Sequence, residues 1–316
     1  MRVIRNSPGQ QLLKSSVVTI GNFDGLHIGH QVLLDTAFRL ADGKRPVAVV
    51  TFEPLPQTWF CPQAAPARLM SVSQKIQCLD AQGVDLVWLM RFNQQLASMT
   101  ADEFVQQVLV NALGATDVVV GDDFHYGKKR QGDITTLGIA GDESGFRLNV
   151  VKAVESDGAR VSSSAIRAAL ADGNMQQAET GLGRSFRTQG RVIRGQQLGR
   201  TLGYPTANMK LAAAPSPVQG VFAVRARICG AENDGINDQN WHDGVASLGT
   251  RPAVAGDEFL IEVHLFDFAG DLYGRRMEVE YIEKLRDEAH FTELDDLVAQ
   301  MREDEQLARK ILQKRD

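Results

Sequence analysis

The sequence lacks several features that would assign a protein class directly. It has three cysteines in 316 residues, and the spacing of Cys61, Cys78 and Cys229 fits neither a zinc site nor a disulfide framework. No apolar run approaches the about 20 residues that span a bilayer, and the first residues lack the apolar core of a signal peptide. The net charge is -5, so no general affinity for nucleic acid is expected. These absences predict a cytoplasmic protein that binds neither membrane nor nucleic acid.

The first half of the chain has the pattern of an α/β domain. Hydrophobic residues make up 43% of the sequence, and its length suits two domains of ordinary size. We expect short apolar strands at 17–20, 47–52, 84–90, 117–121 and 147–152. Amphipathic helices are expected between them at 29–40, 73–82 and 100–113. Continuous apolar strands between helices predict a doubly wound parallel sheet that is covered on both faces.

The sequence pattern of strands alternating with helices ends near residue 180. Strands separated by Gly, Asp and Asn turns, with little helix between them, are expected at 188–193, 220–228, 244–248, 259–266 and 277–282. This pattern predicts an antiparallel β-barrel, and a long amphipathic helix begins near Thr292. We therefore expect two domains, at residues 1–182 and 183–316.

The first candidate site is Gly25-Leu26-His27-Ile28-Gly29-His30, between the first strand and helix of the α/β pattern. Ligands of such folds bind at the carboxyl ends of the strands. The helix N-terminus there offers unpaired N–H groups and a positive dipole end, and the glycines let the backbone approach a phosphate. Imidazoles at His27 and His30 can donate to phosphate oxygens as pyrophosphate leaves. The alternative for this motif alone is a pair of surface histidines in a glycine-rich turn.

A second helix N-terminus extends this candidate site. Ser163 and Ser164 open an expected helix, and as structural residues they would cap it. Arg167 in the first turn is badly placed for the helix dipole, unless it meets an anionic ligand. Two helix N-termini, two histidines and an arginine that converge at one sheet edge would form a triphosphate site.

The second candidate site is Gly203-Tyr204-Pro205-Thr206-Ala207-Asn208, which follows a basic, glycine-rich stretch. The stretch lacks the lysine spacing of a Walker A loop, but its glycines expose N–H groups to phosphate oxygens. The Thr206 hydroxyl and the Asn208 amide oxygen are ligands of the kind that Mg²⁺ takes. The alternative is a turn that is anchored by proline and contains an asparagine.

Glu262 is a candidate general base in the strand expected at 259–266. By alternation it shares a face with Leu260, His264 and Phe266, while Ile261 and its alternate neighbours form the other face. A carboxylate among apolar neighbours suits proton abstraction. The alternative is a strand glutamate that faces water.

Five motifs then occur in order along the chain: GNFDGLHIGH, TFEPLP, GDDFHYG, VSSSAIR and GYPTAN. Together they resemble the bacterial bifunctional riboflavin kinase/FAD synthetases, over essentially the whole chain. The resemblance implies an adenylyltransferase domain of the HxGH, Rossmann-like superfamily, followed by a riboflavin kinase barrel. It implies that riboflavin and ATP give FMN in the second domain, and that FMN and ATP give FAD and pyrophosphate in the first. Mg²⁺ is then the implied cofactor, and flavin-dependent apoproteins are possible recipients of the products.

The resemblance also assigns roles to residues. In the first domain, the residues implied in ATP binding are Gly21, Asn22, Phe23, Asp24, His27, Gly29, His30, Ser163, Ser164 and Arg167. The segments 51–56 and 122–132, with Asp123, would lie near the flavin. In the second domain, Gly203 would contact ATP, and Thr206 and Asn208 would hold its magnesium. Glu262 would be the base toward the ribityl 5′-hydroxyl of riboflavin.

The chain departs from the family pattern at a few positions. Leu55 stands in place of the usual histidine, His125 and Tyr126 replace an Arg/Phe-like pair, and Ser164 replaces a threonine but keeps its hydroxyl. The changes at Leu55, His125 and Tyr126 concern the flavin contacts more than the ATP chemistry. Two other functions fit the sequence less well: a nucleotidyltransferase for another phosphorylated acceptor, and a flavin-binding regulatory protein without turnover.

Overall fold

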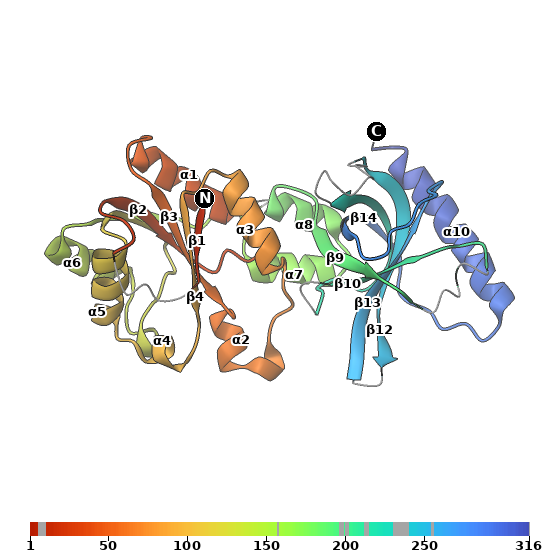
Figure 1. Ribbon diagram of the computed structural model, residues 1–316, viewed down its shortest axis with the longest axis horizontal. Coiled ribbons are helices and arrows are strands. Elements are labelled where there is room, and N and C mark those ends of the chain that lie inside the picture. The colour runs from red at the N-terminus through yellow and green to blue at the C-terminus, as the bar shows by residue number, and fades with distance from the viewer. Residues whose placement is uncertain are drawn as a thin grey trace. The chain divides into compact units, whose positions relative to one another are not determined.

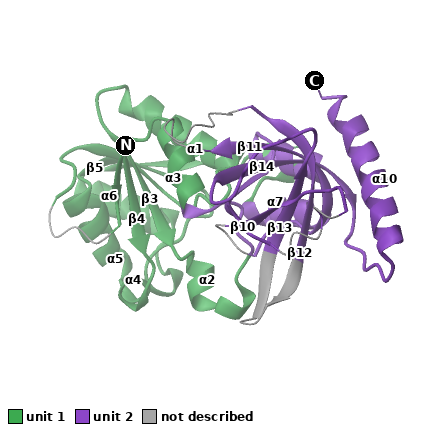
Figure 2. Ribbon diagram, turned by 45° about the vertical axis from the view of Figure 1, so that its right-hand side comes forward, with its two compact units in different colours: residues 1–66, 73–162 green, residues 67–72, 163–316 purple. Residues whose placement is uncertain are grey.

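The computed structural model describes residues 1–5, 11–156, 158–195, 199, 202–211, 215–229, 240–253 and 256–315 (Figure 1). The chain divides into two compact units (Figure 2). Unit 1 comprises residues 1–66 and 73–162, and unit 2 comprises residues 67–72 and 163–316. Each unit has its own sheet, so the change from alternating strands and helices to strands and turns in the sequence corresponds to a change of architecture.

Unit 1 is built on a parallel sheet which, within the described residues, has six strands in the order β1-β4-β3-β2-β5-β6. Their bounds are β1 Arg2–Ile4, β2 Ser16–Ile20, β3 Val47–Glu53, β4 Leu86–Arg91, β5 Ala115–Gly121 and β6 Arg147–Val151. The chain runs outward from β2 to β3 and β4 on one side, and later to β5 and β6 on the other. The strand order therefore reverses at β2, which is where doubly wound folds bind their ligands.

Helices cover both faces of this sheet. The helical elements are α1 Ile28–Ala41, α2 Pro56–Phe60, α3 Val72–Ala81, α4 Gln94–Ser98, α5 Ala101–Phe104 with a π-helical continuation Val105–Ala112, and α6 Ile134–Ser144. On one face, Val17 packs with Leu33 and Ala37 of α1. On the other, Val18 packs in a cluster with Val108 of the π-helical segment. The alternate valines of one strand thus enter different cores, which confirms the predicted parallel sheet with two covered faces.

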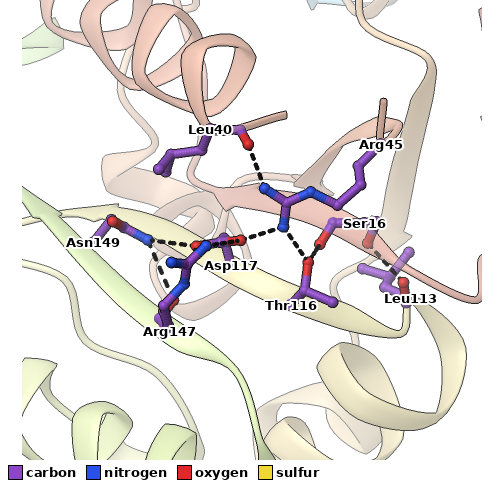
Figure 3. A network of polar contacts seen from close by, with 8 residues as sticks. All are labelled: Ser16, Leu40, Arg45, Leu113, Thr116, Asp117, Arg147 and Asn149. Atoms are coloured by element: carbon purple, nitrogen blue, oxygen red, sulfur yellow. Dashed lines mark hydrogen bonds and ion pairs between the residues drawn. The ribbon is translucent and has the colours of Figure 1, made fainter. Parts of the chain in front are cut away.

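A buried ion-pair network ties together the amino ends of β5 and β6 (Figure 3). The Asp117 carboxylate has no exposed side-chain surface and accepts bonds from Arg45 and, at 3.0 Å, from Nε of Arg147. Asn149 Nδ2 also donates to it, at 3.4 Å. Burial disfavours the charged form, but the two guanidinium groups outweigh burial and hold the pKa of Asp117 below its ordinary value. This network therefore stabilises the amino ends of β5 and β6, which lie at the end of the sheet opposite to the carboxyl end of β2.

Unit 2 contains α7 Ser163–Ala171 and α8 Met175–Leu182, followed by a closed antiparallel barrel. Over the described part of the chain the barrel order is β10-β13-β12-β11-β14-β9, closed by pairing of β9 with β10. The strand bounds are β9 Arg187–Ile193, β10 Ala207–Leu211, β11 Gly220–Cys229, β12 His242–Ala253, β13 Gly256–Leu265 and β14 Arg276–Arg286. The predicted barrel is confirmed, although the sequence pattern did not reveal β10.

The predicted C-terminal helix is α10, Leu294–Leu312. Its Ala308 and Leu312 pack against Phe266 and Ile282 of the barrel unit. The buried Asp304 of this helix accepts a bond from Nη2 of Arg286 at 2.7 Å. Among the described residues, no helix has both the length and the apolar character needed to cross a membrane.

Candidate nucleotide sites in the two units

The segment between β2 and α1 forms a tight, strained turn at the carboxyl end of β2. Phe23, Gly25 and Leu26 have φ values of 47°, 83° and 42°. Phe23, Asp24 and Leu26 are buried, so side chains of the turn anchor it in unit 1. The Gly21 N–H donates to the carbonyl of Val50 in β3 at 3.1 Å. Positive φ in residues other than glycine persists only where the surroundings enforce it, and such strain concentrates at functional sites.

The two histidines of the motif lie together at the start of α1. His27 is the N-cap residue, and its ring stacks on His30 with centroids 3.7 Å apart and planes 23° apart. Gly29 makes this arrangement possible, because a Cβ atom there would lie 3.1 Å from Cε1 of His27. The structure therefore brings together the predicted residues from Gly21 to His30 in one turn and helix N-terminus.

His30 is held in its neutral form. Burial, and then the charges of His27 and Lys75, keep the pKa of His30 well below its ordinary value of 6.5. Its Nδ1 is buried and has no hydrogen-bond partner among the described atoms. A neutral imidazole at a helix N-terminus can present one N–H donor to a phosphate without a change of protonation.

Sequence reasoning missed Lys75 of α3, which contacts this turn from within unit 1. Lys75 is 1% exposed, and its Nζ donates to the carbonyl of Asn22 at 2.7 Å. It also donates to Thr51 Oγ1 at 3.3 Å, and Thr51 donates to the same Asn22 carbonyl at 3.0 Å. The available signal was its spacing, because Lys75 and Leu79 lie four residues apart on the buried stripe of α3.

The predicted flavin-side loop 122–132 follows β5. The Asp123 carboxylate accepts a bond from Nη2 of Arg160, in β8 (Ala159–Arg160), at 2.6 Å. Tyr126 is buried and stacks on Phe124 with centroids 5.6 Å apart. Of the two departures from the family pattern in this loop, the Tyr126 ring thus belongs to the core, and the exposed His125 borders solvent.

Four aromatic rings gather at the carboxyl ends of β3 and β4. Neighbouring centroids among Phe52, Trp59, Phe60 and Phe92 lie 4.9–5.9 Å apart. Phe60 is nevertheless 60% exposed, so the cluster presents an aromatic surface to solvent. Leu55, the third departure, is buried at the start of α2. The sequence reasoning did not identify this cluster.

Ser163 and Ser164 are the first two residues of α7, as expected. Arg167 in the same helix donates from Nε to the carbonyl of Ala67 at 2.6 Å, and all these residues belong to unit 2. The expected triphosphate site combines them with the histidine turn of unit 1. That convergence stays a prediction.

In the barrel, strand register aligns the predicted kinase residues. Asn208 of β10 lies directly opposite Glu262 of β13, and Glu262 lies opposite Ser247 of β12. Residues opposite each other share a face, so three adjacent strands contribute one polar row. Asn208 is buried and Glu262 is half-buried, while Ile261, Val263 and Leu265 are buried, as the alternation predicts.

The turn before β10 packs against this row. Gly203 has a φ of 86°, and the carbonyl of Pro205, next to Thr206, lies 2.9 Å from Nδ1 of His264. This bond agrees with a structural role for His264. A Cβ atom on Gly195 would lie 2.3 Å from Nδ2 of Asn208, so the backbone comes close to the amide there. Residues 196–198, 200 and 201 of the basic, glycine-rich stretch lie outside the described residues.

Comparisons with known proteins find similarity along nearly the whole chain. The model of the FAD synthetase family matches residues 9–165, and that of the riboflavin kinase family matches residues 182–312. The chain is 41% identical over 311 residues to a bifunctional riboflavin kinase/FMN adenylyltransferase of Haemophilus influenzae, covering 98% of both chains. It belongs to the bifunctional riboflavin kinase/FMN adenylyltransferase family. A Pseudomonas fluorescens family member is 45% identical over 300 residues, or 94% of this chain and 93% of the relative.

A solved structure has the same fold as this family member. It is a protein from Streptococcus pneumoniae described as a macrolide-efflux protein, with a TM-score of 0.83 and 31% identity. The match covers 98% of the present chain and 99% of the other. The two family models leave residues 166–181 between them, which hold most of α7 and α8. The compact units divide at 162/163, and a domain boundary at 182/183 stays a prediction.

Proposed function

We propose that the two units carry out consecutive steps on one flavin, with the site residues named above. The chain has the two activities of its family. Riboflavin and ATP give FMN and ADP, and FMN and ATP give FAD and pyrophosphate. The observation that carries the assignment is that each unit brings together predicted site residues for one step: the histidine pair in unit 1 and the Asn208–Glu262 pair in the barrel.

In the adenylylation step, a phosphate oxygen of FMN attacks the α-phosphorus of ATP, and the bond to pyrophosphate breaks. His27 and the neutral His30 donate to the phosphate oxygens that gain charge, together with the N–H groups at the start of α1. The turn from Gly21 to Asp24 lines the approach to the phosphates. Ser163, Ser164 and Arg167 complete the binding of the triphosphate.

The flavin of this step stacks on the aromatic cluster of Phe52, Trp59, Phe60 and Phe92, in which Phe60 is exposed and the other rings are half-buried. A flat aromatic ring system gains both apolar contact and stacking from such a surface. The cluster includes Phe52 of the segment 51–56, for which the family resemblance implies a position near the flavin. Asp123 borders the same ligand from the loop after β5.

In the kinase step, the Glu262 carboxylate takes the proton from the ribityl 5′-hydroxyl of riboflavin, the oxygen attacks the γ-phosphorus of ATP, and the bond from that phosphorus to ADP breaks. The Thr206 hydroxyl and the Asn208 amide oxygen are donors that fit Mg²⁺, which combines few protein oxygens with phosphates and water. Mg²⁺ bound there would neutralise charge on the phosphates. Gly203 lets the turn approach the nucleotide.

We also propose that the enzyme works in the cytoplasm and that flavin-dependent apoproteins receive its products. The test of the overall function is a time course with purified chain, riboflavin, ATP and Mg²⁺, with the flavins separated by chromatography. FMN that appears first, followed by FAD, is the expected result. FMN alone would contradict the assignment of unit 1. Conversion of neither flavin would favour a regulatory flavin-binding protein or a different acceptor.

A further inference from the structure

Lys75 is a buried charge beneath the histidine turn of unit 1. Its ammonium group lies 2.7 Å from the carbonyl oxygen of Asn22 and 3.3 Å from Thr51 Oγ1. Asn22 lies two residues after the end of the central strand β2 and directly before Phe23, the first residue of the turn with positive φ. The strand β3 and the helix α3 thus both hold the same backbone carbonyl at the entrance of the turn.

Stability alone does not explain a lysine at this position. Removing an ammonium group from water is unfavourable, and an apolar side chain of similar size often serves the fold equally well or better. A buried, fully bonded polar group instead fixes one conformation among several. Here the fixed element is the backbone that carries His27 and His30.

We propose that Lys75 is a positioning residue for adenylylation, which fixes the Asn22 carbonyl and thereby the turn that places His27 and His30 against the phosphates. The proposal rests on the proposed role of these histidines. Phe23 and Leu26 need positive φ to bring the chain from Asn22 to the helix N-terminus. Strain of this kind persists only when the surroundings over-determine it, and Lys75 with Thr51 supplies that restraint at the start of the turn.

The electrostatics agree with this geometry. Among the charged groups that act on His30 are His27, from the same turn, and Lys75, from α3; both disfavour a proton on its ring. Lys75 therefore also helps to keep His30 neutral while adding positive charge below a site for triphosphate. A residue with a purely structural role would not need to do both.

The test compares Lys75→Met, Thr51→Val and His30→Gln in the full-length chain. Lys75→Met keeps the length of the side chain and removes the ammonium. We expect kcat for adenylylation of supplied FMN to fall by about 100-fold, within the range for misplaced catalytic groups, while KM for FMN changes by less than about threefold. Thr51→Val leaves the Lys75–Asn22 bond in place and should cost about tenfold or less.

Two further measurements separate positioning from misfolding. Riboflavin phosphorylation by the same preparation should stay within about twofold of the unmodified chain, and the loss of adenylylation should persist at 10 °C, where a marginally stable unit refolds. The pKa of His30, followed by NMR of labelled histidines, should rise toward its ordinary value in Lys75→Met.

The outcomes distinguish the role of Lys75 from the role of the proposed histidine site. If His30→Gln abolishes adenylylation while Lys75→Met leaves kcat unchanged, the role of Lys75 is wrong and the proposed site stands. If His30→Gln itself keeps full adenylylation, the proposed site is wrong. A loss in Lys75→Met that disappears on cooling would also overturn the positioning role, because it would reflect stability alone.

Discussion

The histidine turn of unit 1 and the polar row of the barrel are assembled in opposite ways. The histidine turn comes from ten consecutive residues, from Gly21 to His30, at the start of one helix. The polar row places Asn208, Glu262 and Ser247 side by side from three separate strands. The first site depends on local backbone conformation, and the second depends on strand register. A one-residue slip between β10 and β13 would move every partner to the other face.

The chemistry of the two nucleophiles explains why the sites differ. A ribityl hydroxyl must lose a proton when it attacks phosphorus, so the kinase step needs a base such as Glu262. The FMN phosphate has already lost most of its second proton at pH 7, because its second pKa is about 6. The adenylylation step therefore needs donors that stabilise charge rather than a base, and we propose that neutral His30 is one of them.

The largest expected effect is that of Glu262→Gln, which keeps the shape of the side chain and removes the base. Riboflavin phosphorylation should fall by about 10²–10⁴-fold, the range for loss of a positioned general base. Adenylylation of supplied FMN should stay within about twofold, because Glu262 lies in the barrel and is not among the residues proposed for that step. Both initial rates can be measured on one preparation by chromatography of the flavins.

The matched control is Glu283→Gln, an exposed glutamate on β14 of the same barrel. It tests the alternative reading of Glu262 as an ordinary strand glutamate, and its kinase rate should match that of the unmodified chain. If Glu262→Gln retained the kinase rate, the assignment of the base would be wrong. If it removed both activities together, the separation into two sites would be wrong.

The next prediction concerns the amino ends of the strands in unit 1, which lie opposite to the histidine turn at the carboxyl end of β2. Asp117→Asn breaks the buried ion pairs with Arg45 and Arg147 and should destabilise unit 1 by about 3 kcal/mol at pH 7. The kcat for adenylylation at 25 °C should not change, because this network lies at the amino ends of the strands and the histidine turn follows the carboxyl end of β2. In a Trp241→Phe background, the two remaining tryptophans, Trp59 and Trp88, both lie in unit 1, so urea unfolding followed by fluorescence reports on it.

The pH dependence of this effect has a definite sign. The folded state lowers the pKa of Asp117, so its stabilisation is complete above the unfolded pKa of about 3.9 and is lost as pH falls through the folded pKa. The difference in stability between the unmodified chain and Asp117→Asn should therefore be constant from pH 7 to about pH 5 and shrink below about pH 4. A difference that grows on acidification would contradict the ion-pair account.

The sequence predicted the local features of the fold well. The apolar strands and the helix that follows His27 appear as expected, and a capping box of Thr100 and Glu103 starts the helix expected at 100–113. They depend on periodicity and on short-range hydrogen bonds, which the sequence displays directly. The family motifs likewise identified His27, His30 and Asn208 as candidate site residues without any knowledge of contacts, and their roles stay predictions.

The missed features depend on contacts between distant residues. The strand β10 is short and follows a proline turn, so the sequence favoured a loop for Asn208, and only pairing with β9 and β13 makes it a strand. Lys75 looked like an ordinary helix lysine, because its partners Asn22 and Thr51 come from other elements. The aromatic cluster combines Phe92 with residues of an earlier segment for the same reason.

The smallest effect sharpens the assignment of the magnesium ligands in the barrel. Thr206→Val removes one hydroxyl that the proposal places on Mg²⁺, while Thr206→Ser keeps it. Loss of one charge-assisted contact of about 1.5 kcal/mol should raise the Mg²⁺ concentration for half-maximal kinase rate by about tenfold. The measurement is a Mg²⁺ titration of riboflavin phosphorylation at saturating ATP.

The serine variant and the second activity make this prediction specific to the barrel. Thr206→Ser should need the same Mg²⁺ concentration as the unmodified chain, because only a methyl group is lost. The Mg²⁺ requirement of adenylylation should be unchanged in both variants, since Thr206 lies directly before the barrel strand β10 and is not among the residues proposed for adenylylation. Equal shifts in Thr206→Val and Thr206→Ser would mean that packing, rather than the hydroxyl, matters at this position. A shift in the adenylylation reaction would mean that the two sites are not independent, and the contrast between a local and an assembled site would then describe their construction but not their operation.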